Sequence, residues 1–376
     1  MKDNESLATE RGLKVLADER RQAILRAVEG QGSITVKELA AEMGVSAVTL
    51  RQDVRALADR GLLTRVHGGA RALASADAAT TEAPPPAQPS AEQQYAIGLV
   101  VPPGGYYYAE VIRGVQNAAR SRGVRVVLAV SGESLAEHQE QVRQLVAGGV
   151  NCLLLMLHPG LQPQDEAEQW LSGLDVPAVL VERRAGLKAG RLERVASDHA
   201  YGAALAVRHL AGLGYDKVAL VARVESPNSV LLSAGYAEAV AAMGLTPGPE
   251  YRISTTDDAA PADARFEEVV RAVEAGEVRA ALVHNDIDAI ALVGLLRARG
   301  LRVPEDLALV TYDDEVAELS EIPLTAVAPP KQAVGSWALD LAVRRLNDPS
   351  TPLAEVLLRP ELRVRASCGA DRRTGG

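Results

Sequence analysis

Residues 45–55 read VSAVTLRQDVR and carry an apolar and a polar face when they are spaced as a helix. Leu50 and Val54 lie on the apolar face, and Ser46 stands where its hydroxyl can cap the first turn. Guanidinium and amide groups on the opposite face can hydrogen-bond to phosphates and to base edges. The candidate contact residues of this segment are Ser46, Ala47, Val48, Thr49, Arg51, Gln52 and Arg55.

A pair of glycines marks a second candidate segment, residues 62–71, which reads LLTRVHGGAR. The pattern predicts two short strands joined by a Gly-Gly turn, the hairpin known as a wing. Glycines let a backbone come close to a phosphate or a minor groove, and arginine and histidine supply hydrogen-bond donors. The candidate contact residues here are Arg65, His67, Gly68, Gly69 and Arg71.

Three predicted helices must position these side chains. Residues 18–29 place Ile24 and Val28 at helical spacing, and residues 35–38 (TVKE) form a capping box for a helix that ends at Gly44. The third helix begins at Ser46 after a short turn that contains glycine, and together with the helix that ends at Gly44 it forms the helix-turn-helix arrangement. We therefore expect a winged helix-turn-helix domain over residues 1–73, with the helix from Ser46 presented to a major groove of double-stranded DNA.

Charge is distributed unevenly along the 376 residues. Residues 11–71 hold 11 Lys and Arg against 7 Asp and Glu, whereas residues 72–376 hold 28 against 39. A basic head on an acidic body is the pattern expected when only the head contacts a polyanion. Residues 74–94 contain four prolines, no lysine or arginine and no large apolar side chain, which predicts a linker between the two.

Several classes of protein are excluded by composition. No apolar run approaches the roughly 20 residues of a membrane span, and the polar start of the chain predicts no secretory signal. Two cysteines, Cys152 and Cys368, provide neither a disulfide framework nor a cysteine-based zinc site. We expect a cytoplasmic protein with no metal and no cofactor.

The head resembles the DNA-binding domain of the deoxyribose-operon repressor (DeoR) family over about residues 18–72. The resemblance is carried by the stretches Arg21–Leu25, Val45–Val54 and Arg65–Ala70. It implies sequence-specific binding to an operator. One departure concerns readout, because that family has two adjacent arginines where this chain has Arg51 and Gln52. Glutamine can pair bidentately with adenine, so the operator of a relative does not transfer.

From residue 95 onward, apolar runs alternate with helical patterns. Runs at 96–101, 124–129, 152–157, 178–181, 217–222, 280–283 and 307–310 predict strands. Continuous apolar strands between helices indicate parallel sheets that are covered on both faces. Such sheets bind ligands beyond the carboxyl ends of their strands. The fold class is therefore α/β, with a winged head.

The body resembles the effector-binding domain of the lactose-repressor (LacI) family, which shares its type I fold with periplasmic sugar-binding proteins. The motifs that carry the resemblance are Tyr107–Glu110 with Arg113 and Gly114, Ser197–His199 with Gly202 and Ala203, Asn285, Asp286 and Ala289, Val303–Leu307, Tyr312–Asp314, and Pro323–Thr325. The resemblance implies a homodimer and two lobes with a ligand between them. We expect lobe 1 at 95–196 and 328–349, lobe 2 at 197–327 and 350–367, crossings near Ala196, Val327 and Pro349, and a disordered tail from residue 368 to 376.

The resemblance also implies a pocket for a small-molecule effector. The residues that it places there are Tyr107, Tyr108, Ser131, His158, Arg183, Asp198, Asn285 and Asp313. Two polar contacts of the family are missing, because Leu232 and Pro329 stand where the family has Arg and Gln. A free sugar is therefore one alternative, and a less hydroxylated ligand or no ligand is another. Asp198, Asp286 and Asp313 can also serve simply as helix caps, and the tyrosines as aromatic contacts between the lobes.

Three function classes follow from these patterns. The first is a DNA-binding regulator, by resemblance a repressor, whose operator affinity depends on a sugar-like effector or whose body serves only for dimerisation. The second is an enzyme of sugar metabolism, against which the chain shows no nucleophile elbow, P-loop, dinucleotide fingerprint or HExxH motif. The third is a solute-binding protein, which the head argues against. We expect a regulator and no enzyme.

Overall fold

The computed structural model describes residues 95–103, 106–132, 134–158, 165–184, 186–189, 192–254 and 264–370 of the body. In the head it describes positions 24, 27–28, 33–36, 39–40, 43, 45, 49–50, 54, 57, 64–66 and 69–71. The chain divides into two units, residues 1–88 and 89–376, and each is described by itself. None of the helices in the described part combines the length and the apolar character that crossing a bilayer requires.

The head contains an antiparallel sheet in the order β1-β3-β2. Its strands are β1 (Ser33–Thr35), β2 (Thr64–Val66) and β3 (Gly69–Arg71). β2 and β3 form the predicted hairpin, but Gly69 pairs with Val66, so Gly69 belongs to the second strand and not to the turn. β1 pairs with β3 and was not predicted, since three residues are too few to show an alternating pattern. The buried core of the head consists of Ile24, Val28, Ile34, Val36, Leu39, Ala40, Leu50, Val54 and Leu57.

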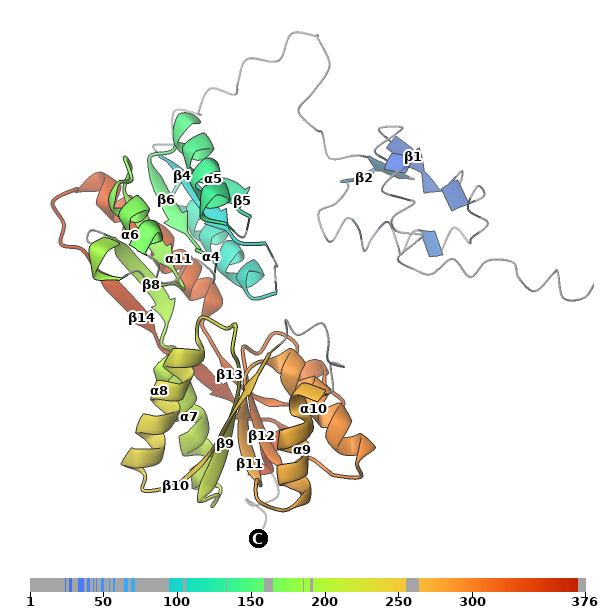
Figure 1. Ribbon diagram of the computed structural model, residues 1–376. Coiled ribbons are helices and arrows are strands. Elements are labelled where there is room, and N and C mark those ends of the chain that lie inside the picture. Colours follow the sequence, from blue (N-terminus) through green and yellow to red (C-terminus); the bar gives the residue numbers. More distant parts are fainter. Residues whose placement is uncertain are drawn as a thin grey trace, which may run out of the picture. The chain divides into compact units, whose positions relative to one another are not determined.

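Lobe 1 of the body is built on a parallel sheet of six strands (Figure 1). In spatial order they are β14 (Glu355–Leu358), β8 (Glu193–Ser197), β7 (Ala178–Val181), β6 (Cys152–Leu155), β4 (Ala96–Val101) and β5 (Arg125–Val130). The apolar residues of α4 (Tyr108–Ser121) and α11 (Lys331–Asn347) share one core cluster with β4 and β6. Those of α5 (Leu135–Ala147) and α6 (Asp165–Ser172) form a second cluster. The sheet is thus covered on both faces, as predicted.

Lobe 2 repeats this arrangement. Its strands, in spatial order, are β10 (Thr246–Ile253), β9 (Lys217–Arg223), β11 (Ala280–Val283), β12 (Ala308–Tyr312), β13 (Thr325–Ala328) and β15 (Glu361–Arg363). All pairs are parallel except the one between β13 and β15. The core cluster that includes α7 (His199–Gly212) and α8 (Ser229–Ala242) is distinct from the one that includes α9 (Glu267–Glu274) and α10 (Asp286–Ala298).

The chain passes between the lobes three times (Figure 1). The first passage follows Ser197 and the second consists of Pro329 and Pro330. The third lies between β14 and β15, at residues 359–360, so the expected position near Pro349 is wrong. β14 pairs with β8 and therefore remains in lobe 1. The Arg345 guanidinium holds the loop before β14 to α11, because its Nη1 donates to the carbonyl oxygens of Pro349 and Thr351 over 2.8 and 2.7 Å.

The expected boundary of the disordered tail is also wrong at its first residues. Ala366–Cys368 form a 3-10 helix, and Cys368 is buried in the core of lobe 2. Thr325 Oγ1 donates a hydrogen bond to its sulfur over 3.1 Å, so this segment packs beside β13. The polar neighbours of Cys368 in sequence concealed that contact. Residues 371–376 lie outside the described part of the chain.

Candidate ligand site between the two lobes

Side chains that follow the strands of the two sheets contact each other. The carboxyl ends of parallel strands lie at one edge of a sheet, where ligands bind in such folds. Tyr106, before α4 in lobe 1, donates a hydrogen bond over 3.2 Å to Asp286 Oδ2 in lobe 2. Glu182 Oε2, after β7 in lobe 1, lies 3.3 Å from Nε2 of His199 at the start of α7. The two edges therefore meet, and the candidate site lies between the lobes.

Glu182 is the centre of the buried polar network on the lobe 1 side. Its carboxylate accepts hydrogen bonds from the hydroxyls of Tyr107 and Ser197, both over 2.8 Å, and from the Ser197 amide over 3.1 Å. Burial alone would raise the pKa of Glu182, but the hydrogen bonds and charge of His199 and the bonds from Ser197 outweigh it and lower the pKa to about 2. Glu182 is therefore an ionised carboxylate whose two oxygens are bonded to protein groups.

Tyr107 and Tyr108 are arranged edge to face, with ring centroids 5.6 Å apart. Burial and the charges of Glu182 and Asp313 raise the pKa of Tyr107 well above its usual value, so its hydroxyl stays a donor. The Tyr108 hydroxyl accepts a hydrogen bond from Nη2 of Arg183. Both tyrosines are thus held by groups of their own lobe, whereas Tyr106 makes the contact with lobe 2 that was one of the alternatives for these tyrosines.

All three side-chain nitrogens of Arg183 also donate hydrogen bonds to other protein groups. Its Nε donates to the carbonyl oxygen of Leu157 over 2.8 Å and its Nη1 to that of Glu182 over 3.0 Å. Its guanidinium lies 5.6 Å from the centre of the Tyr108 ring, and the residue is only 5 % exposed. Arg183 therefore braces the ends of β6 and β7 and is not presented to a ligand in this conformation.

Ser131 and His158 lie at the ends of β5 and β6. Ser131 is buried, and its hydroxyl lies 3.0 Å from Nε2 of His138 on α5. This contact directs the Ser131 hydroxyl toward α5. His158 is half-buried and does not line the cavity described below.

Asp198 caps a helix, which was the structural alternative for this residue. Its carboxylate accepts a hydrogen bond from the amide of Tyr201 over 3.0 Å, at the first turn of α7. The expected cap at Asp313 is not found, because Asp313 has a positive φ of 92° and precedes no α-helix directly. Asp286 accepts instead from the amides of Glu315 and Val316 and so fixes the loop after β12.

Asn285 and Asp313 lie together at the carboxyl edge of lobe 2. The Asn285 side chain hydrogen-bonds to the Asp313 carboxylate, and both residues are buried. The Oδ1 atom of Asn285 has no hydrogen-bond partner among the described residues. Nearby, burial and the positive charges of His199 and Arg223 lower the pKa of His284 to about 3, which keeps this imidazole neutral.

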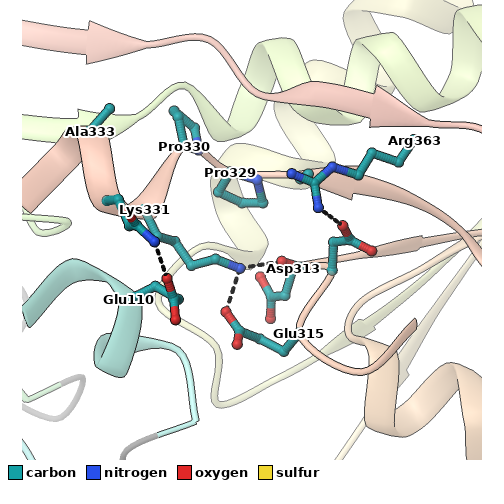
Figure 2. Close-up of a pocket in the computed structure, with 11 residues that line it drawn as sticks. Glu110, Asp313, Glu315, Pro329, Pro330, Lys331, Ala333 and Arg363 are labelled. Atoms are coloured by element: carbon teal, nitrogen blue, oxygen red, sulfur yellow. Dashed lines mark hydrogen bonds and ion pairs between the residues drawn. The ribbon is translucent and has the colours of Figure 1, made fainter. Parts of the chain in front are cut away.

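A cavity of about 400 Å³ opens beside Asp313, at the second passage between the lobes (Figure 2). Its lining residues are Glu110, Asp313, Asp314, Glu315, Ala328, Pro329, Pro330, Lys331, Gln332, Ala333 and Arg363. Lys331 donates to the main-chain oxygen of Asp313 and forms an ion pair with Glu315 over 2.5 Å. Arg363 pairs with Asp314 over 2.6 Å. The volume falls within the range of small-molecule sites.

Of the eight residues expected to contact a ligand, only Asp313 lines this cavity. Glu110, Glu315 and Lys331 were missed. A usable signal existed for Lys331, because it follows the proline pair at a predicted passage between the lobes, where the chain must border the cleft. Sequence reasoning placed Tyr107, Tyr108 and Arg183 correctly at strand ends but could not show that they are bonded to one another.

Eight of the twelve expected DNA contacts lie outside the described residues. Ser46, Ala47, Val48, Arg51, Gln52, Arg55, His67 and Gly68 are outside them. Thr49 is helical and half-buried, and Arg65, Gly69 and Arg71 belong to β2 and β3. These assignments stay predictions.

Comparison with known proteins agrees with this organisation. Residues 20–76 match the DeoR-like helix-turn-helix domain, and residues 207–368 match the periplasmic binding protein-like domain. The chain is 31 % identical to the HTH-type transcriptional regulator CelR of Thermobifida fusca over 271 residues, which cover 69 % of this chain and 76 % of that protein. It is 25 % identical to the arabinose metabolism transcriptional repressor of Geobacillus stearothermophilus, over 89 % of this chain and 90 % of that protein.

A solved structure is similar over most of the chain as well. The transcriptional regulator CelR–cellobiose complex aligns with a TM-score of 0.62 at 26 % identity, covering 89 % of this chain and 99 % of that one. The two-lobed body, the residues at its strand ends and these relatives lead to one assignment. The chain belongs to the LacI family of transcriptional regulators and carries a DeoR-like helix-turn-helix domain at its head.

Proposed function

We propose that the protein represses transcription by binding a double-stranded operator as a homodimer, and that a small molecule held between the lobes changes its operator affinity. The observation that carries this proposal is the combination in one chain of a helix-turn-helix domain at residues 20–76 and a two-lobed body with a cavity beside Asp313. A ligand at a passage between lobes can favour one relative orientation of the lobes, and it shifts operator affinity by its differential affinity for the two orientations.

The effector site would extend from the cavity to Asp313 and Asn285, with Tyr107, Tyr108, Ser131, His158, Arg183 and Asp198 supporting the strand ends around it. One similar solved structure is a transcriptional regulator in complex with cellobiose, and a relative is named for arabinose metabolism. These relatives favour a small polar metabolite over an apolar one. The proposed place of action is the cytoplasm, where the operator is.

Dimerisation is supported by the exposed apolar residues of lobe 1. β5 is an edge strand of its sheet, and Leu128 and Val130 on it are 48 % and 56 % exposed. Apolar side chains gathered at an edge mark contact surfaces. Sedimentation velocity of the full chain tests this part, and a monomer at micromolar concentration would contradict it.

The test of DNA binding begins with selection of bound duplexes from a random pool by the full chain. Fluorescence anisotropy with the selected duplex then gives the affinity at several salt concentrations. We expect affinity to fall steeply with salt, because phosphate contacts release counterions. A chain that enriches no sequence and binds no duplex even in dilute buffer would refute the proposal.

A second candidate is a regulator whose body acts only as a dimerisation module. It is favoured by one observation: the groups around Glu182 and Arg183 are bonded to each other and leave few side chains for a ligand. The two candidates differ in one measurement. A metabolite that binds the full chain and changes operator affinity identifies the first, and operator binding that no metabolite changes, whether or not one binds, identifies the second.

A further inference from the structure

The chemistry of the cavity beside Asp313 defines the charge of its ligand, given the proposed function. Carboxylates outnumber cations on its walls: Glu110, Asp313, Asp314 and Glu315 face only Lys331 and Arg363 (Figure 2). Both cations are already engaged. Arg363 pairs with Asp314, which Arg365 also contacts over 2.7 Å, and Lys331 pairs with Glu315. An anionic ligand would therefore meet no unengaged cation on the described walls.

Asp313 is the cavity carboxylate that forms no direct ion pair with a described residue, although the charges of Lys331 and His199 act on it. It is 4 % exposed, and its side chain is bonded to the Asn285 amide. Lys331 contacts the main-chain oxygen of Asp313, and its ammonium is shared with Glu315. A buried carboxylate without a direct ion-pair partner is costly, and a ligand that brings a positive charge to it lowers that cost.

The polar atoms that lack partners next to Asp313 give an independent indication. Asn285 Oδ1 and Asp286 Oδ1 are buried and have no hydrogen-bond partner among the described residues. Both atoms are hydrogen-bond acceptors, so this edge of lobe 2 lacks the hydrogen-bond donors that would satisfy them. Burial also raises the pKa of Asp286, Asp313 and Glu315, and the charge of Asp313 adds to the rise at the other two.

From this geometry we propose that the effector carries a protonated amine, which lies against the Asp313 carboxylate in the cavity at the second passage between the lobes. An ammonium supplies both the positive charge and the donors that this edge lacks. The class includes amino sugars and short diamines, and it excludes phosphorylated and carboxylated metabolites. The two residues missing from the family's pocket, at Leu232 and Pro329, are consistent with a ligand that differs from a free sugar.

The test uses matched pairs of probes on the full chain without DNA, measured by isothermal titration calorimetry. Glucosamine is compared with glucose, and 1,4-diaminobutane with 1,4-butanediol, so that each pair differs chiefly in the amine. Glucose 6-phosphate serves as the anionic probe. We expect at least one amine to bind about tenfold or more tightly than its neutral counterpart, the equivalent of one stabilising charge contact. Which amine binds distinguishes an amino sugar from a diamine.

Two variants locate the effect. In Asp313→Asn the amine should bind no better than its neutral counterpart, whereas Asp340→Asn, which removes a carboxylate on α11 that pairs with Arg122, should keep the preference. If circular dichroism shows that Asp313→Asn does not fold, the comparison of amine and neutral probes on the unaltered chain still tests the inference. Equal binding within both pairs, tighter binding of glucose 6-phosphate than of glucose, or no binding of either amine at millimolar concentration overturns the inference. Operator binding is measured separately, so the proposed function can stand when this inference fails.

Discussion

Replacing Glu182 by glutamine tests the network that joins the two lobes. The carboxylate accepts bonds from Tyr107, Ser197 and His199, and its pKa of about 2 lies below the ordinary value of 4.5. A shift of this size corresponds to about 3 kcal/mol, because one pKa unit is about 1.4 kcal/mol. Glu182→Gln keeps the shape of the side chain and removes the charge, so we expect it to lower the free energy of unfolding by about 3 kcal/mol at pH 7.

The sign of the pH dependence follows from the lowered pKa. A carboxyl group whose pKa is lower in the folded state stabilises the fold at pH values above its unfolded pKa, and this contribution is lost as the pH falls through the folded pKa. The difference between wild type and Glu182→Gln should therefore be constant above about pH 5 and shrink as the pH falls from there toward 2.

Tryptophan fluorescence is a suitable probe for this measurement. The chain has two tryptophans, and both Trp170 on α6 and Trp337 on α11 belong to lobe 1, as does Glu182. Urea unfolding of the full chain is followed at pH 7 and at pH 3. Glu321→Gln is the matched control, because Glu321 is exposed and pairs with the exposed Arg297, where a loss of about 0–1 kcal/mol is expected. A loss at Glu182 no larger than in this control, or one equal at both pH values, would refute the assigned ionisation.

Further predictions concern packing, capping and DNA contacts. Gly335→Ala should destabilise the protein by about 1–3 kcal/mol, because a Cβ there would lie 2.0 Å from a carbonyl oxygen of α4. Gly212→Ala, with nothing within 4 Å, should be neutral or stabilising by up to about 1 kcal/mol in the same urea titration; similar losses in both would contradict the packing argument. Asp198→Ala should cost about 1 kcal/mol through the lost cap while leaving the affinity for a bound probe unchanged, and a weaker affinity in calorimetry would instead make Asp198 a ligand contact. Arg55→Ala should cost about 1–3 kcal/mol and relax preference at one base pair, whereas Arg71→Ala should weaken all duplexes alike and reduce the salt slope by about one unit. Equal behaviour of the two variants across selected duplexes would overturn these roles.

The long interior strands were predictable, and the short edge strands were not. Residues 96–101, 178–181 and 280–283 form strands with the expected bounds, because both faces of each are buried and the apolar run is continuous. β14 and β15 have four and three residues and alternate between exposed and half-buried positions. Their pattern is that of a loop with occasional apolar residues, and the misplaced third passage follows from it.

For the candidate site, the sequence could predict only which residues follow the strands. The order of apolar runs and helices in the sequence determined that residues after parallel strands share an edge, and the family resemblance pointed to Asp313 and Asn285 at such an edge; of the two, Asp313 lines the cavity. Glu182 was missed, although Arg183 beside it was chosen, because the sequence does not show that Ser197 and His199 surround this carboxylate.

The sequence by itself determined the kind of protein. Local periodicity, caps and turns depend on residues close together in the chain, so the winged head, the alternating body and the LacI resemblance could be read from it, while the linker at residues 74–94 lies outside the described residues and stays a prediction. Only the tertiary structure decided which polar groups neutralise each other and which remain for a ligand. That choice depends on groups more than a hundred residues apart, as in the pairing of Tyr106 with Asp286, and on how far burial strengthens each charge.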